Sequence, residues 1–338
     1  MKKILVTGAS GVIGTSIIKN LLKRNSDYYI QALANHDEES FSTLDKNKFT
    51  FINGDCRDYS LVDSLVSNSN AVIHLAAPSS FLMYKEKPIE STIDTIQIFL
   101  NIMESMRKHK VKKIIHASTS AVYEGNKFPY KETMFISPPE LKSLSKKMNE
   151  DIGKIYSSSS GITAVAMRPM SVYGDDESKK GGYANVISLF VWAMVSGKIP
   201  IVWGNGNQTR DFIHAEDAAE MFCLALEKDV YTQSFNVGTG IETSFNEIID
   251  IINSLRKTNI KPKYVPVPID IYARRLLSDN TLVEKVLGFK PKITIQEGIK
   301  RVIKEFESKH IKDKKLADKQ EFFKTLLPQE KHSQSKTD

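Results

Sequence analysis

The stretch that decides the fold lies at the start of the chain and reads Lys3-Ile-Leu-Val-Thr-Gly-Ala-Ser-Gly-Val-Ile-Gly-Thr-Ser-Ile-Ile18. Its first half is a short apolar run rich in β-branched residues, which predicts a buried strand. Its second half, with Leu21 beyond it, spaces Ile13, Ile17 and Leu21 for one buried face of a helix. The sequence therefore predicts a strand that leads directly into a helix.

Three glycines, Gly8, Gly11 and Gly14, occupy the junction. Glycine at the first position permits a tight turn, at the second lets the backbone approach a phosphate, and at the third lets the helix close on the strand. A pyrophosphate would then lie at the helix N-terminus. The GxxGxxG spacing departs from the common GxGxxG, and an ordinary turn is the alternative; the strand before it and the helix after it favour a dinucleotide site.

Strand-like runs alternate with helical patterns through the first half of the chain, which predicts a parallel sheet with right-handed crossovers and helices on both faces. This is the doubly wound α/β class. The runs are Ile4–Val6, Tyr29–Ala34, Phe49–Ile52, Ala71–Leu75, Lys113–Ala117 and Thr163–Arg168.

The rhythm changes after Pro169. We expect residues 1–170 to form a dinucleotide-binding domain, to which 208–240 returns, and 171–308 to form mainly a smaller lobe over the carboxyl ends of the strands, where ligands bind in open α/β folds. The serines at 157–160 read as a loop between a helix and a strand. Residues 309–338 are crowded with lysines and read as a charged, flexible tail.

The bulk composition fits a cytoplasmic protein. The chain has 338 residues, 41% of them hydrophobic, and two widely separated cysteines that suggest reduced thiols. The apolar run within 186–195 is too short to span a bilayer, so no membrane partner is expected. The net charge of +7 is concentrated toward the C-terminus without any nucleic-acid motif, so we expect no nucleic-acid partner either.

Taken together, the motifs of the chain are similar to those of a known family. The strings Thr7–Gly14, His74-Leu-Ala-Ala-Pro78 and Arg210-Asp-Phe-Ile-His214 resemble the extended branch of the short-chain dehydrogenase/reductase superfamily, the NAD-dependent epimerases and dehydratases of nucleotide sugars. The resemblance implies a Rossmann sheet with a smaller C-terminal substrate-binding lobe, NAD or NADP as cofactor, and a nucleotide-diphosphate sugar as substrate. It also implies a homodimer, formed here through the helices expected at 92–108 and 141–156.

Two strand ends bear on the form of the cofactor. Asp55 follows the third strand, where the family's Gly-Asp pair binds the adenine amino group; a helix N-cap is the alternative reading. At the end of the second strand the position of the family's ribose-binding Asp is Ala34, and no Arg follows. Asn35 could bond the ribose and His36 could tolerate a phosphate, so NAD and NADP both remain open.

The fourth strand end, His74-Leu-Ala-Ala77, borders the cofactor in the family, although taken alone it reads equally well as a buried strand end. The resemblance assigns cofactor binding to Gly8, Ser10, Gly11, Val12, Ile13, Gly14, Asn35, Asp55, Cys56, Leu75, Ala76, Ala77 and Lys146.

The catalytic positions fall in two segments. In His116-Ala-Ser-Thr-Ser-Ala-Val-Tyr123, alignment on the family's Val-Tyr puts the catalytic hydroxyl at Thr119, followed by Ser120. A hydroxyl there could hydrogen-bond the sugar oxygen during hydride transfer. Dehydratases and decarboxylases carry a Glu at the position of Ala121, so the usual base for proton abstraction beside a ketone is missing.

The second segment should hold Tyr-x-x-x-Lys on one helix face. Lys146 falls on the lysine, but the tyrosine position is Lys142. In the family the lysine binds the nicotinamide ribose and lowers the pKa of the tyrosine, which moves the proton. Either Lys142 has a lowered pKa and replaces the tyrosine, or proton transfer is lost or has moved to Tyr84, Tyr130 or another group.

The substrate positions lie later in the chain. A planar guanidinium holds phosphate oxygens bidentately, and the resemblance puts Arg210 on the diphosphate of the substrate. The resemblance also assigns substrate binding to Asn185 and to an arginine near the end of the chain, for which Arg274 and Arg275 are both candidates. No metal site is expected.

Three functions remain open on the sequence alone. The first is an NAD(P)-dependent nucleotide-sugar epimerase or ketoreductase. The second is a catalytically impaired or non-enzymatic protein of the same fold that binds a nucleotide or nucleotide sugar. The third, a nucleic-acid binder that uses the basic tail, has the least support.

Overall fold

The computed structural model describes residues 1–24, 27–35, 41, 44–45, 47–268, 272–309 and 318–319. The chain divides into two compact units. The first comprises Met1–Asp175, Arg210–Glu242 and Leu276–Gly298, and the second comprises Asp176–Thr209, Thr243–Arg275 and Ile299–Asp338.

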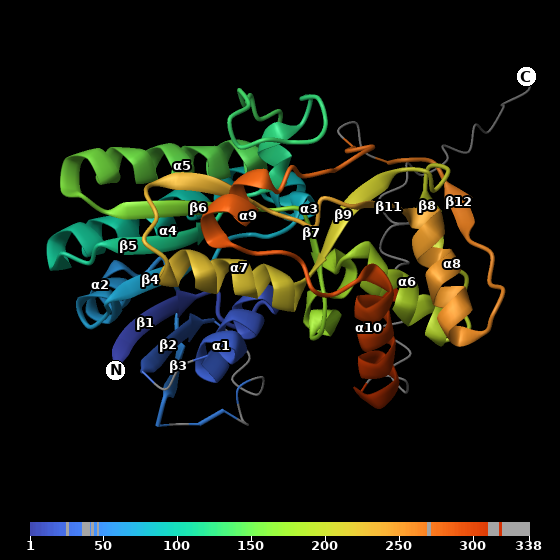
Figure 1. Cartoon of the computed structure of the whole chain (residues 1–338), viewed down its shortest axis with the longest axis horizontal. Helices are drawn as coiled ribbons and strands as arrows, with labels where there is room; N and C mark the ends of the chain where they lie inside the picture. The colour runs from blue at the N-terminus through green and yellow to red at the C-terminus, as the bar shows by residue number, and fades with distance from the viewer. Residues whose placement is uncertain are drawn as a thin grey trace, which may run out of the picture. The chain divides into compact units, whose positions relative to one another are not determined.

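The first unit is built on a seven-stranded sheet in the order β10-β6-β5-β4-β1-β2-β3 (Figure 1). All six neighbouring pairs are parallel. The order reverses between β1 and β4, as in a doubly wound Rossmann sheet. The strands are β1 (Lys2–Thr7), β2 (Tyr28–Ala34), β3 (Phe49–Asn53), β4 (Ala71–His74), β5 (Lys113–Ala117), β6 (Thr163–Pro169) and β10 (Gln233–Val237).

Helices cover both faces of this sheet, because successive residues of a strand point to opposite faces. In β1, Ile4 and Val6 enter one core with residues of α1 and α7, and Leu5 enters another with residues of α2 and α4. The helices of this unit are α1 (Val12–Arg24), α2 (Tyr59–Ser67), α3 (Phe81–Glu86), α4 (Pro88–His109), the short 3₁₀ helix η2 (Ser120–Tyr123), α5 (Leu141–Ser160), α7 (Ala215–Glu227) and α9 (Thr281–Leu287).

The predicted doubly wound class is confirmed, and the six strands expected in the first half are all present. The loop predicted at 157–160 is wrong: these serines form the last turn of α5, which continues to a left-handed Gly161 cap. The segment 276–298, which we expected in the smaller lobe, belongs to the first unit. Its helix α9 packs against α7 and β10, and Val283, Leu287 and Phe289 enter the same core as α1 and α7.

The second unit contains an apolar helix, α6 (Val186–Val195), in which every residue from Ile187 on is buried. Before it lies the 3₁₀ segment η3 (Glu177–Tyr183), and after it come β8 (Ile201–Trp203), α8 (Phe245–Arg256) and β12 (Lys263–Val265), which pairs in parallel with β8. β7 (Ser171–Tyr173) belongs to the first unit, whereas β9 (Thr209–His214), β11 (Glu242–Ser244) and α10 (Ile295–Lys309) lie where the sequence passes from a segment of one unit to a segment of the other. β7, β9 and β11 form a three-stranded sheet in the order β11-β9-β7.

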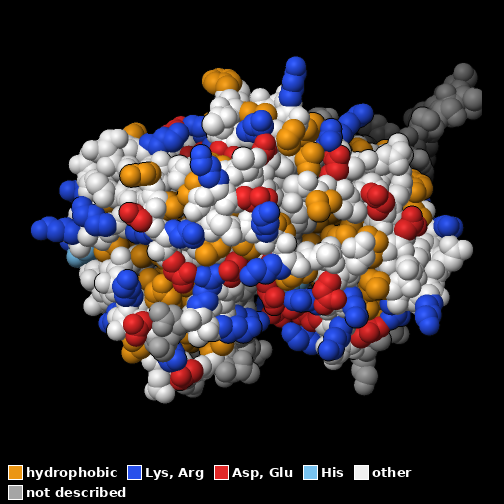
Figure 2. Space-filling view, in the orientation of Figure 1, with side chains coloured by type: hydrophobic (Ala, Val, Ile, Leu, Met, Phe, Trp, Pro, Cys, Tyr) orange, Lys and Arg blue, Asp and Glu red, His pale blue; other side chains and the backbone are white. Residues whose placement is uncertain are grey.

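Within the described ranges, no helix has both the length and the apolarity that crossing a membrane requires. The tail predicted at 309–338 lies outside the described residues, except for Lys309, Asp318 and Lys319. On the face drawn in Figure 2, basic and acidic side chains are interspersed rather than gathered into one basic patch.

Candidate active site

The predicted cofactor residues follow five neighbouring strands, β3, β2, β1, β4 and β5. Gly8 follows β1, Asn35 follows β2, Asp55 lies beyond the end of β3, Leu75 follows β4, and Thr119 lies beyond the end of β5. Because these strands are parallel and adjacent, their carboxyl ends meet at one edge of the sheet. The structure therefore brings the predicted cofactor and catalytic segments to the same edge.

The three glycines at the carboxyl ends of these strands are needed for different structural reasons. Gly8 has φ +66°, and a Cβ there would come within 2.7 Å of the Ala76 nitrogen. A Cβ on Gly14 would come within 2.5 Å of the Gly8 oxygen, so the turn and the helix contact both require glycine. Gly11 is exposed, and a Cβ there would only approach the Gly8 oxygen to 3.3 Å. A side chain at Gly11 would thus extend toward solvent at the N-terminus of α1 rather than into the protein.

The rest of this loop is anchored by backbone. The Gly11 N–H donates to the Gly8 oxygen and the Ala9 N–H donates to the Leu33 oxygen, which ties the turn to β2. Val12 is buried at the first position of α1, whereas Ser10 and Ile13 remain half-buried beside the exposed Gly11.

Asp55 accepts hydrogen bonds from Arg57 rather than capping a helix. One carboxylate oxygen accepts from the Arg57 backbone N–H (2.8 Å), and the other accepts from its guanidinium at 2.6 and 3.0 Å. These bonds lower the pKa of Asp55, which keeps the carboxylate charged. The cap of α2 is Asp58, which accepts from the Leu61 N–H, so the alternative reading of Asp55 as an N-cap is wrong.

The residues next to Asp55 and those that follow β2 and β4 differ in their burial. Burial raises the pKa of Cys56 to about 12, so its thiol stays protonated near neutrality. Asn35 is exposed, and His36 lies outside the described residues. After β4, the Leu75 N–H donates to the Thr7 oxygen, and Ala76 and Ala77 are half-buried.

Thr119 and Ser120 are buried where β5 passes into η2. The Thr119 Oγ1 accepts from the Ala121 N–H (3.2 Å), which fixes the side chain at the start of η2. The threonine hydroxyl can still donate its own hydrogen. Because η2 packs against α5, the Thr119 segment and the helix that carries the two lysines are neighbours.

At the start of α5 the Glu140 carboxylate caps the N–H groups of Lys142 (2.7 Å) and Ser143 (2.8 Å). Lys142 is half-buried, and Lys146, one turn later, is only 5% exposed. Burial, together with the positive charge of Lys142, lowers the pKa of Lys146 to about 7.

A buried polar network, which the sequence did not reveal, lies farther along α5. Glu150 forms an ion pair with Arg168 of β6 (2.6 Å) and accepts a hydrogen bond from the Ser118 hydroxyl (2.5 Å). Arg168 also donates to the Tyr123 hydroxyl (2.7 Å), which donates to Asn236 Oδ1 of β10 (2.8 Å). The signal available in sequence was the position of Glu150, four residues after Lys146 on the same helix face.

The tyrosines considered as substitutes for the missing phenol are both buried. The Tyr84 hydroxyl is paired with Thr95 (2.5 Å), and burial raises its pKa. Tyr130 stacks on Tyr123 with ring centroids 4.9 Å apart, and burial raises its pKa as well. Neither hydroxyl is poised to exchange a proton near neutrality.

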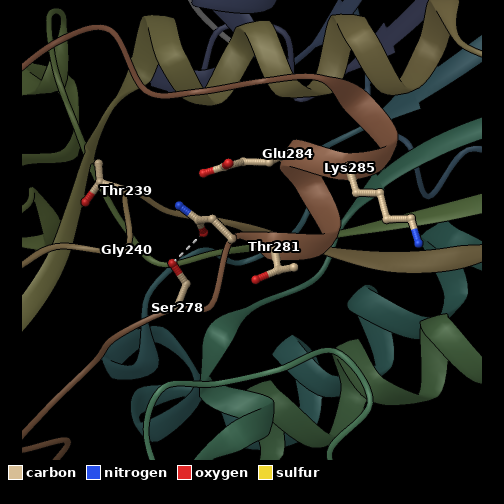
Figure 3. Close-up of a pocket in the computed structure, with 7 residues that line it drawn as sticks. Thr239, Gly240, Ser278, Thr281, Glu284 and Lys285 are labelled. Atoms are coloured by element: carbon tan, nitrogen blue, oxygen red, sulfur yellow. Dashed lines mark hydrogen bonds between the residues drawn. The ribbon is translucent and has the colours of Figure 1, made fainter.

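Arg210 stands at the start of β9, beside a carboxylate that organises the neighbouring loops. Asp211 is fully buried and accepts from the N–H groups of Thr239 (2.6 Å), Gly240 (3.0 Å) and Ser278 (3.1 Å). These loops line an open cavity of about 610 Å³, in which Thr281, Glu284 and Lys285 come from α9 (Figure 3). None of the predicted site residues lines it, so this cavity does not mark the cofactor edge.

The remaining predicted substrate residues belong to the second unit. Asn185 caps α6, accepting from the Ile187 N–H at 3.0 Å. Arg274 and Arg275 are exposed, and the Arg274 carbonyl accepts from the Thr209 N–H. Among the described residues, no cluster of three or more His, Cys, Asp or Glu side chains could hold a metal ion.

Known proteins are similar to this chain in sequence and architecture. A Methanocaldococcus jannaschii protein named provisionally as a UDP-glucose 4-epimerase is 37% identical over 310 residues, covering 89% of this chain and 97% of the relative. The structure of a Thermotoga maritima UDP-glucose 4-epimerase with UDP-glucose is 26% identical, with a TM-score of 0.83 and coverage of 90% and 99% of the two chains. A Thermus thermophilus UDP-glucose 4-epimerase solved with NAD is 27% identical, with a TM-score of 0.80 and coverage of 91% and 99%.

The family comparison agrees with these relatives. The model of the NAD-dependent epimerase/dehydratase family matches residues 4–238, which include the glycine turn, Thr119, Lys146 and Arg210. The resemblance described from the motifs is therefore confirmed, as is the class of cofactor that it implies. The chain belongs to the NAD-dependent epimerase/dehydratase family.

Proposed function

We propose that this protein is an NAD-dependent nucleotide-sugar epimerase or ketoreductase that acts by hydride transfer at a sugar carbon. The observation that carries the proposal is the single sheet edge that gathers the glycine turn, Asp55, Thr119 and the helix of Lys146. The names of the relatives, which include UDP-glucose 4-epimerases, support the substrate class.

The residues of the edge fit a bound dinucleotide. The exposed Gly11 leaves room for the diphosphate at the start of α1, and the charged Asp55 can accept from the adenine amino group. When bound, NAD supplies a carbon that takes up a hydride and returns it. Asn35, which follows β2, offers an amide to the ribose of the dinucleotide.

On the substrate side, Thr119 can donate its hydroxyl hydrogen to the reacting sugar oxygen, and Arg210 is suited to the diphosphate. Asn185, Arg274 and Arg275 are assigned to the nucleotide and sugar on the strength of the family pattern.

A second candidate function rests on one residue. Lys142 stands where the family has its proton-carrying tyrosine, so a protein of this fold that binds a nucleotide sugar without turning it over is the alternative.

One experiment separates the two functions. Purified protein with NAD is incubated with UDP-glucose, UDP-N-acetylglucosamine and UDP-glucuronate in turn, and the sugar products are followed by proton NMR while reduced-cofactor fluorescence is recorded. We expect an epimerised or oxidised sugar from at least one substrate, and a loss of that product in Thr119→Val. Tight binding of a nucleotide sugar without any product in the parent protein contradicts the enzymatic proposal and supports the binding protein.

We also propose a homodimer through α4 and α5. The two helices pack on each other and carry outward-facing apolar side chains at helical spacing. On α4 these are Ile89, Ile93 and Leu100, and on α5 they are Leu141, Leu144, Met148 and Ile155. A second copy of the chain would cover this two-helix stripe, which would otherwise leave apolar surface in water.

A further inference from the structure

We propose that the two lysines of α5 exchange the roles that the family divides between tyrosine and lysine: Lys146 carries the proton, and Lys142 tunes it. This inference rests on the proposed hydride-transfer function. It goes beyond that function by naming the acid/base group, which the replacement of the tyrosine leaves unassigned.

The first support is the isolation of the Lys146 side chain. It is 95% buried, since 5% of its surface is exposed, and it makes no hydrogen bond or ion pair with any other residue that the structure describes. A buried ammonium without a counter-ion costs far more free energy than a neutral amine in the same place. This setting favours release of the proton.

The second support is the charge of the groups around it. Lys142 precedes it by one turn on the same helix face, and its positive charge lowers the pKa of Lys146 to about 7 after the larger effect of burial. From β4 and β5, His74 and His116 are electrostatically coupled to Lys146, and burial holds the pKa of His116 at about 4 and that of His74 well below its ordinary value. Both rings are therefore neutral near pH 7 and add no positive charge beside Lys146.

The carboxylate of Glu150 does not neutralise Lys146. Glu150, one turn later on α5, is committed to Arg168 through a 2.6 Å ion pair and a second bond at 2.9 Å. From α3, the Tyr84 phenol is paired with Thr95 and carries no charge near neutrality.

The third support is the pair of ring nitrogens that remain without a partner. His74 Nε2 and His116 Nδ1 are buried and bind no other described group. Orphaned buried polar atoms usually mark a place for ordered water, so these two can hold water within the buried region around Lys146. Such water would give the amine a route to exchange its proton with solvent.

The chemistry balances with Lys146 alone. A bound oxidised nicotinamide would accept the carbon-bound hydrogen of the sugar with its two electrons, and the neutral Lys146 amine would accept the hydroxyl proton, which leaves a ketone and an ammonium group. In the reverse direction the Lys146 ammonium would return the proton to the sugar oxygen as the hydride returns to carbon, which restores the alcohol and the amine. Lys142, which is half-buried and held at the capped N-terminus of α5, supplies positive charge and moves no proton.

The test is a pH titration of the protein labelled with carbon-13 at the lysine Cε, followed by NMR without cofactor or substrate. We expect one lysine signal to titrate near pH 7, to vanish in Lys146→Met, and to move to higher pH in Lys142→Met. The control is Lys147→Met, which removes the adjacent, partly exposed lysine of the Asp151 ion pair and should leave that signal unchanged.

Two results overturn the proposal: a Lys146 signal that titrates with the other lysines near pH 10, or a signal near pH 7 that persists in Lys146→Met and is lost altogether in Lys142→Met. If Lys146→Met does not fold, the shift in Lys142→Met decides alone. The titration does not depend on turnover. If Lys146 titrates near pH 7 in a protein without activity, the proposed function is refuted, but the assignment of the lowered pKa to Lys146 stands. In an active protein, Lys142→Met should shift the acidic limb of the profile of kcat against pH to higher pH. The variant should retain activity at high pH.

Discussion

Glu150 of α5 and Arg168 of β6 form an ion pair, with 2.6 Å between Oε2 and Nη2, in which both side chains are almost completely buried. The pair fastens the helix of the two lysines to the sheet beneath it. Burial alone would raise the pKa of Glu150, but the hydrogen bonds and the charge of Arg168 outweigh burial and hold the pKa below its ordinary value.

The first prediction concerns the stability that this pair contributes. Glu150→Gln leaves the Arg168 charge buried and should lower the free energy of unfolding by about 3–5 kcal/mol. Urea denaturation at pH 7 measures it. The exposed pair of Glu90 with Lys87 provides the control, because Glu90→Gln should cost about 1 kcal/mol or less. Equal, small losses in both variants would contradict the prediction.

The same pair sets the direction of a pH effect. A carboxyl with a folded-state pKa below its unfolded value contributes stability that is complete above the unfolded pKa, about 4.3 for Glu, and that is lost as the pH falls through the folded pKa. The difference in unfolding free energy between the parent and Glu150→Gln should therefore shrink below about pH 4. A difference that grows on acidification would show that Glu150 is not held as a carboxylate.

The glycine turn predicts two different outcomes for two substitutions. Gly11→Val should fold and lose NAD binding, because its side chain would extend toward the ligand rather than into the protein. Gly8→Val should fold poorly, since its Cβ would meet the Ala76 backbone at a positive φ. Circular dichroism and isothermal titration with NAD separate these effects. A folded Gly11→Val protein with unchanged NAD affinity would show that the diphosphate does not bind at this turn.

Arg210 should distinguish the substrate from the cofactor. A charge-assisted hydrogen bond to phosphate is worth about 1.5–3 kcal/mol, so Arg210→Ala should weaken UDP-sugar binding by roughly 10- to 100-fold. NAD affinity should stay at the parent value in the same titrations. Equal loss of both ligands would mean that Arg210 supports the fold rather than the diphosphate.

The two-helix stripe predicts the state of assembly. The double variant Ile93→Glu, Leu144→Glu places charge at the centre of the proposed dimer surface and should give a monomer in sedimentation velocity. Tyr231→Glu, at a residue that is 88% exposed on another segment, should leave the parent state unchanged. A parent protein that is monomeric at all concentrations would contradict the proposed homodimer.

Local patterns determined much of the fold in advance. The six strands and their parallel order follow from short apolar runs between helical periods, and Gly8 and Gly14 are required by contacts that the spacing already implied. The seventh strand, β10, is harder to identify from the sequence because three residues of its run Gln-Ser-Phe-Asn-Val are polar, so it lacks the apolar pattern of a buried strand. The serines at 157–160 misled for the opposite reason: their composition favours a loop, but packing of α5 on α4 overrides it.

The candidate site likewise has features that the sequence predicted and features that it did not. Positions at strand ends were foreseeable, because parallel topology fixes which edge they occupy. The partners of individual side chains were not: Asp55 accepts from Arg57, Asp58 takes over the cap, and Glu150 is bound to Arg168. These contacts depend on rotamers and on segments far apart in the chain. The contrast between Lys142 and Lys146 likewise required the burial of each side chain.

Because β10 comes late in the sequence, the sheet of the first unit cannot be completed until much of the chain has been synthesised. β6 is synthesised by Pro169, but the strand that covers its open edge is complete only at Val237, and α9 follows at Thr281–Leu287. During that interval a nascent first unit presents an unpaired strand edge, the kind of surface that chaperones protect and that aggregates recruit. We therefore expect a fragment ending at Asp175 to be captured by a chaperone or to precipitate, whereas a fragment ending at Gly298 should reach a compact first unit; pulse proteolysis of stalled chains of the two lengths would compare them.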